Sequence, residues 1–199
     1  MKKSKVILTI ISLVLVVAMS VAGTLAFLKV NTTPVVNTFS PSNIGLTLDE
    51  TTTATDYKMI PGVEMKKDPK VTVTADIDTY VFVKVKESAN FDDYMTYAIA
   101  SGWKLLDGST TIDTVTEDEY VLYREVTATE ASVQGGASFY VLAGGTKSAN
   151  GVVTTKTTVK EADMTSAKTN APTLTFTAYA VQKDAMADVN AAWTEAQAQ

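Results

Sequence analysis

The sequence predicts an all-β protein: an antiparallel, jelly-roll-like β-sandwich with one or two short helices, preceded by a signal peptide. Apolar and polar residues alternate with a period of two in six separate segments, which is typical of strands with one buried face. Turn-forming residues such as Gly135-Gly136 and Asn150-Gly151 separate the segments. Because no regular alternation of strands and helices appears, an antiparallel sandwich is favoured over a parallel sheet.

The N-terminus has the three regions of a secretory signal peptide. Lys2, Lys3 and Lys5 precede an apolar run from Val6 to Val21, and small residues follow in Ala22–Ala26. We expect cleavage between Ala26 and Phe27, with cleavage after Ala22 as the second choice. A retained membrane anchor is the alternative, because the apolar run is close to the shortest length that spans a bilayer.

Residues 27–199 are expected to form a single domain. Its predicted strands begin with Ile44–Leu48, in which Ile44, Leu46 and Leu48 share a face, and end with Thr173–Val181. In Tyr80–Lys86, three valines share one face while Tyr80 and Phe82 share the other. The remaining predicted strands are Val71–Ala75, Tyr120–Val126 and Ser138–Ala143.

Two segments have helical spacing instead. Asn90–Trp103 is predicted to be a helix that Gly102 ends, and Asp184–Gln197 is predicted to be a C-terminal helix with Asp184 as its N-cap. The apolar stripe of the second helix is expected to dock on its own domain. Thr146–Ala171 is predicted to be a long excursion or loop between strands.

Composition excludes several kinds of chemistry. The 199 residues include no Cys and no His, so disulfides, thiolate zinc sites, Ser-His-Asp triads and HExxH zinc sites are excluded. Cleavage after Ala26 would remove three lysines and no acidic residue, changing the net charge from −5 to −8. An acidic domain is a poor ligand for nucleic acid, and none is expected as a partner.

Acidic and aromatic residues are the remaining candidates for a site. Paired acids such as Asp92-Asp93 could offer oxygens to Ca²⁺ or serve a glycosidase, but solvated turns explain them more simply. We therefore predict no catalytic residue, no metal site and no cofactor. Five aromatics could line a ligand groove or fill the sandwich core: Trp103, Tyr120, Tyr123, Tyr140 and Tyr179.

The segment Tyr57–Thr74 is predicted to be a turn followed by a strand. Pro61-Gly62 suits the turn, since Pro fixes φ and Gly accepts positive φ. Lys66-Lys67 then lead into Asp68 and Pro69, and Pro69 is tolerated at the first position of a strand.

This segment and the two ends of the chain resemble the TasA/camelysin (CalY) family of secreted Gram-positive biofilm-matrix proteins. The resemblance rests on Pro61, Gly62, Lys67, Asp68 and Pro69. It also rests on Gly23–Phe27 at the signal junction, Asn37–Phe39, Ile44–Leu48 and the closing strand Leu174–Gln182. Residues 87–171 match only in general strand character.

The resemblance implies a secreted subunit of extracellular fibres or biofilm matrix, processed by a SipW-type signal peptidase. It implies self-association by donor-strand exchange, in which the mature N-terminal segment completes a sheet in the next subunit. The candidate donor is Phe27–Phe39, with apolar positions Phe27, Val30, Val35, Val36 and Phe39. Other matrix proteins are possible partners, and contact with a membrane is expected only through the uncleaved signal segment.

Two alternatives remain open. Phe27–Phe39 suits an ordinary first strand or a frayed end as well as a donor. The protein as a whole could instead be a monomeric cell-surface binding module or adhesin of the same fold. The metalloprotease activity associated with the camelysin branch is rejected, because the chain has no His to bind zinc.

Overall fold

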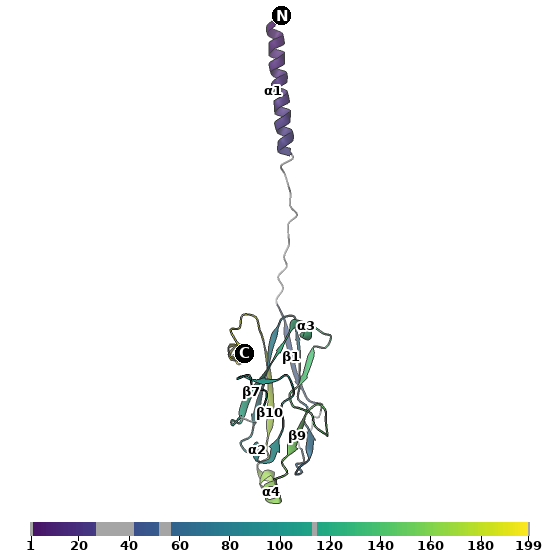
Figure 1. Cartoon of the computed structure of the whole chain (residues 1–199), viewed down its shortest axis with the longest axis vertical. Coiled ribbons are helices and arrows are strands. Elements are labelled where there is room, and N and C mark those ends of the chain that lie inside the picture. Colours follow the sequence, from purple (N-terminus) through teal and green to yellow (C-terminus); the bar gives the residue numbers. More distant parts are fainter. Residues whose placement is uncertain (1, 27–41, 52–56, 113–114, 199) are drawn as a thin grey trace. The chain divides into compact units, whose positions relative to one another are not determined.

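The computed structural model describes residues 2–26, 42–51, 57–112 and 115–198, and it divides into two compact units, Met1–Ser40 and Pro41–Gln199 (Figure 1). The predicted donor strand, with Phe27, Val30, Val35, Val36 and Phe39, lies outside the described residues. The predicted cleavage bond joins Ala26, the last residue of α1, to Phe27, which lies outside the described residues.

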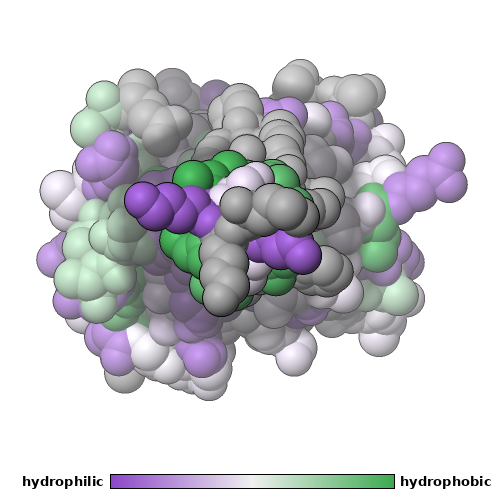
Figure 2. Space-filling view, turned by 90° about the horizontal axis from the view of Figure 1, so that it is seen from above, coloured by the Kyte–Doolittle hydropathy of each residue, from purple (hydrophilic) through white to green (hydrophobic). Residues whose placement is uncertain are grey.

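The first unit contains helix α1 (Lys2–Ala26). The view along this helix in Figure 2 shows hydrophobic side chains around it, together with hydrophilic ones. Its described apolar residues, from Val6 to Val17, expose between 52% and 72% of their surface. Among the described residues, no helix combines the length and the hydropathy required of a membrane span.

The second unit is built from antiparallel strands, as predicted. One sheet has the order β1-β3-β8, a second has β10-β4-β7-β6, and a small third sheet has β2-β9-β5. The strands of the first sheet are β1 (Ile44–Asp49), β3 (Lys70–Ala75) and β8 (Ala137–Tyr140). Those of the second are β10 (Leu174–Gln182), β4 (Thr79–Glu87), β7 (Glu119–Val126) and β6 (Lys104–Leu105), and those of the third are β2 (Glu64–Lys66), β9 (Val152–Thr155) and β5 (Met95–Thr96).

One hydrophobic core joins the first two sheets into a sandwich-like arrangement. Val71 and Val73 of β3 and the alternating valines of β4, Val81, Val83 and Val85, are fully buried in it. Their period of two arises because successive side chains of a strand point to opposite faces. Each such valine contributes about 1.5–3 kcal/mol relative to an exposed one.

The opposite face of β4 carries a second apolar cluster, which helix α5 (Val189–Ala196) covers. Tyr80 and Phe82 pack there with the buried Ala192 and Ala196, and the Trp193 ring lies 5.3 Å from the Phe82 ring. The terminal helix therefore docks on its own domain. It begins later than predicted: its N-cap is Asp188, which accepts a hydrogen bond from the Ala191 amide at 2.8 Å, whereas Asp184 lies in the preceding turn.

The predicted helix over Asn90–Trp103 is wrong beyond its first turn. Helix α2 covers only Phe91–Tyr94, and Met95 is already extended with φ −123° and ψ 160°. The chain straightens there because β5 pairs with β9, and Ile99 bridges Leu142 further on. These partners are remote in sequence, so local spacing could not reveal them.

The stretch Thr146–Ala171 contains more structure than predicted. It includes strand β9 and helix α4 (Glu161–Thr169), at whose start Asp163 accepts a hydrogen bond from the Lys160 amide at 2.7 Å. A further short helix, α3 (Ala128–Ala131), follows β7 and begins with a capping box made by Thr127 and Glu130.

Candidate strand-binding groove

Two edge strands border a hollow of the sandwich. In the described residues, β1 pairs only with β3, and β10 pairs only with β4. β1 and β10 contact each other, yet no ladder of hydrogen bonds joins them. Each therefore presents a row of backbone N–H and C=O groups that a further strand can pair with.

The core is incompletely covered along this seam. Ile44, Leu46 and Leu48 of β1 face the core, as predicted, but they are only partly buried. On β10, Leu174, Phe176 and Ala178 behave in the same way. The central strands differ, because the equivalent valines of β3 and β4 are fully buried. Apolar surface thus remains exposed between the two edges.

The hollow has a volume of about 530 Å³. Ile44 and Leu46 form one wall, and the β10 residues from Ala178 to Gln182 form the other. Ser42, Ile77, Met186 and Glu195 complete the lining. We call this hollow the β1/β10 groove. It combines apolar side chains with two backbone edges that no described strand pairs with, which are the features that bind an extended peptide.

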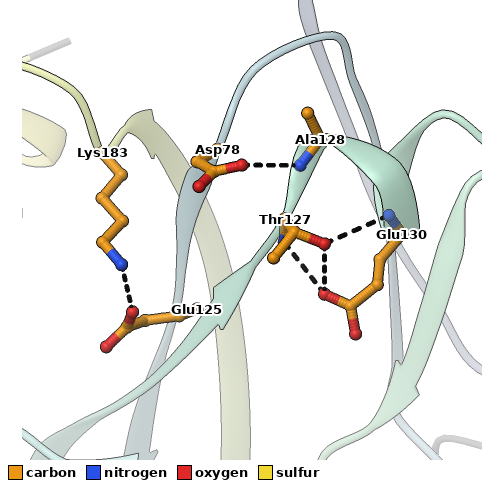
Figure 3. A network of polar contacts seen from close by, with 6 residues as sticks. All are labelled: Asp78, Glu125, Thr127, Ala128, Glu130 and Lys183. Atoms are coloured by element: carbon orange, nitrogen blue, oxygen red, sulfur yellow. Dashed lines mark hydrogen bonds and ion pairs between the residues drawn. The ribbon is translucent and has the colours of Figure 1, made fainter.

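A network of polar contacts fixes one end of the groove (Figure 3). Asp78, next to Ile77, accepts a hydrogen bond from the Ala128 amide at 2.8 Å, and its carbonyl accepts another from the Lys183 amide at 2.8 Å. The Lys183 ammonium pairs with Glu125 of β7, and this contact raises the pKa of Lys183. The connection between β10 and α5 is therefore held against the β3–β4 turn.

The Tyr57–Thr74 segment does not line this groove, although its last residues belong to β3 of the sandwich. Pro61 and Gly62 form the predicted turn, in which Gly62 has φ +73° and the Val63 amide bonds to the Ile60 carbonyl at 3.0 Å. Lys67 pairs with Glu50 at 2.8 Å. Asp68 and Pro69 are buried just before β3, which begins at Lys70.

Asp68 ties the segment to the chain after β1. Its carboxylate is 1% exposed, and it accepts hydrogen bonds from Thr51 and from Lys66, whose Nζ is 3.2 Å away. Burial by itself raises the pKa of Asp68, but these two hydrogen-bond donors outweigh it and leave the pKa below its ordinary value. Asp68, one of the residues on which the family resemblance rests, therefore stabilises the fold around β3.

A buried polar cluster lies elsewhere in the sandwich. The Tyr97 hydroxyl contacts both the Glu87 carboxylate and the Tyr120 hydroxyl. Burial, reinforced by Asp92 and Asp118, raises the pKa of Glu87, although the hydrogen bond from Tyr97 opposes this. Burial is also the main reason that the pKa of Tyr97 and of Tyr120 is raised.

The five predicted aromatics do not meet in one groove. Trp103, Tyr120 and Tyr123 are buried, and the Trp103 indole donates to the Tyr140 carbonyl at 2.8 Å. Tyr179 lines the β1/β10 groove, while Tyr140 lines a second hollow. In the described part of the chain, no three acidic residues lie close enough together to hold a metal ion.

Sequence reasoning did not locate the groove. The alternation of Ile44, Leu46 and Leu48 predicts a half-buried strand, but it does not tell which strands lie at sheet edges. One signal was available: β1 and β10 are the first and last strands predicted, and both belong to the segments on which the family resemblance rests.

A scan against protein-family models gave no match, and searches of curated proteins and of solved structures gave none either.

Proposed function

We propose that this chain is a secreted structural protein, a subunit of extracellular fibres or biofilm matrix of the TasA/camelysin type. In this proposal the domain is jelly-roll-like and non-enzymatic, and subunits assemble by donor-strand exchange. The observation that carries the proposal is the β1/β10 groove, where partly exposed apolar side chains lie between two sheet edges that no described strand pairs with.

The proposed donor is Phe27–Phe39 of a second copy. Thirteen residues in extended conformation reach about 43 Å, since a strand rises about 3.3 Å per residue. That reach exceeds the length of the nine-residue strand β10, about 30 Å. The donor pairs with one of the two edges, and its apolar positions cover the exposed seam. Because donor and groove are different surfaces, the contact does not close and a filament grows.

Signal cleavage would make the donor available. The lysines at the start of α1 and its apolar surface support a signal peptide that ends at Ala26. A SipW-type peptidase would cleave before Phe27 and release the donor from the helix. The product would act outside the cell, in the matrix or on the cell surface.

The test compares two chains, one beginning at Phe27 and one beginning at Ser40. We expect the longer chain to form filaments in negative-stain electron microscopy and the shorter chain to sediment as a monomer. Mixing the two should shorten filaments, because the shorter chain accepts a donor but provides none. Equal filament formation by both chains would refute donor-strand exchange, and a monomer in both cases would favour the binding-module alternative.

A further inference from the structure

The chain contains one arginine, Arg124, against sixteen lysines. It lies on β7, and its guanidinium lies over the Phe139 ring of β8 at 4.0 Å from the ring centroid. Nη1 also donates to the Ser101 carbonyl at 3.2 Å. This residue therefore links the second sheet to the edge strand β8 of the first, away from the β1/β10 groove.

The backbone leaves room for this guanidinium. Gly102 has φ +90°, and a Cβ built on it would lie 2.4 Å from Nη1 of Arg124. Any other residue at position 102 would be strained and would push the guanidinium aside. Phe139 on one side and Gly102 nearby thus hold the planar group in a defined orientation.

No carboxylate neutralises this charge within the described residues. Lys66, Lys67, Lys84, Lys86 and Lys183 all form ion pairs, but Arg124 forms none. Glu130 raises the pKa of Arg124 from a distance, but its carboxylate is bonded to Thr127. Burial has the larger effect and lowers that pKa. A partly desolvated cation that has no anionic partner among the described residues is stabilised when an anion binds.

Arg124 borders a hollow of about 400 Å³, which is a size typical of small-molecule sites. Ser101, Ser138, Tyr140, Gly144 and Ala149 are among the residues that line it. Among the described strands β8 is an edge strand, so its outer backbone groups can bind a ligand, apart from the Tyr140 carbonyl that the Trp103 indole occupies. The hollow offers one positive charge surrounded by several neutral hydrogen-bonding groups.

We propose that this hollow binds a carboxylate carried on a polyhydroxylated ring, that is, a uronic acid or a residue of an acidic polysaccharide. The guanidinium binds the carboxylate in the two-pronged geometry that arginine favours. The outer backbone groups of β8 and the polar residues of the lining bind the sugar hydroxyls. A single guanidinium in a chain of net charge −5 matches one negative charge and disfavours a dianion such as phosphate. The site is independent of the proposed assembly.

The presence of one arginine makes a direct test possible by NMR. A ¹⁵N-labelled full chain has a single arginine Nε–H signal, which we expect to shift saturably on titration with sodium glucuronate. Glucose and inorganic phosphate should each bind at least tenfold more weakly. An unmoved Nε–H signal, or binding of glucose or phosphate as tight as that of glucuronate, would overturn the proposal.

Variants test the same site by isothermal titration calorimetry. Arg124→Gln should weaken glucuronate binding at least tenfold, and Arg124→Lys should weaken it several-fold because it retains charge but loses the planar fork. Lys104→Gln is the matched control, since it removes an exposed positive charge from the neighbouring strand β6 without touching the hollow. An equal loss in the Lys104 variant would show a general charge effect and contradict a site at Arg124. Filament formation, measured separately, should be unchanged in both.

Discussion

The open seam makes a quantitative prediction about leucine truncation. Replacing a fully buried leucine with alanine costs about 2–5 kcal/mol of unfolding free energy. Leu46 of β1 is only partly buried, whereas Leu122 of β7 is 0% exposed in the same core. In a chain beginning at Ser40, we therefore expect Leu46→Ala to cost about 1–2 kcal/mol and Leu122→Ala about 3–4 kcal/mol.

Assembly should increase the cost of Leu46→Ala and leave the cost of Leu122→Ala unchanged. A donor strand that covers Leu46 gives its side chain the contacts that the isolated subunit lacks. Leu46→Ala should then weaken each subunit contact by a further 1 kcal/mol or so, which is about fivefold in the critical concentration of filaments. Leu122→Ala removes nothing from the groove, so its folded form should assemble at an unchanged concentration.

Urea unfolding of the Ser40 chains and sedimentation of filaments from the Phe27 chains provide the two measurements. Equal losses of unfolding free energy for the two variants would mean that the seam is closed in the isolated subunit. An unchanged critical concentration for Leu46→Ala would mean that the groove is not where subunits meet. Either result would refute the reasoning.

Further predictions concern stability. Burial raises the folded pKa of Glu87, so ionisation of this carboxyl opposes folding, and stability is lost as pH rises through the folded pKa. In Glu87→Gln the urea midpoint should therefore depend less on pH between about pH 4 and pH 7. Asp68 behaves in the opposite way, because its folded pKa is lowered: Asp68→Asn should destabilise the protein by about 1–3 kcal/mol at pH 7 and by little at pH 2, and an equal loss at both would contradict the role of its charge. Trp193→Ala should cost about 2–4 kcal/mol through lost contacts with Phe82 and Tyr179 while the strand signal in circular dichroism remains, and a change below 0.5 kcal/mol would show that α5 is not docked.

The strands could be predicted from the sequence because their signal is local. Val81, Val83 and Val85 alternate with Tyr80 and Phe82, and both sets find a hydrophobic partner, one in the core and the other beneath α5. Two apolar faces on one strand predict a sheet covered on both sides. The docking of the terminal helix follows from the same pattern.

Features that depend on distant partners could not be predicted in this way. Phe91, Tyr94 and Met95 have helical spacing, but pairing of Met95 with Thr155 draws the chain into a strand. The groove depends on which strands are edges, and the position of Arg124 depends on Phe139 and Gly102. The sequence did contain one signal for this site, because Arg124 is the only arginine in an acidic chain.

The central claim is that the N-terminal segment of one copy enters the β1/β10 groove of another. Because the chain has no native cysteine, single cysteines report this contact cleanly. Chains beginning at Phe27 and carrying Val30→Cys, Val35→Cys, Val36→Cys or Phe39→Cys are each mixed with a chain carrying Ala180→Cys and oxidised. A disulfide requires Cα atoms within about 7 Å, so donor-strand exchange predicts disulfide-linked pairs of the two different chains for at least one donor position. In the control, the partner chain carries Thr129→Cys instead of Ala180→Cys. Thr129 lies on α3, outside the groove, so this mixture should give no disulfide-linked pairs. Disulfide-linked pairs at no donor position, or equally many with the Thr129 variant, would contradict the account.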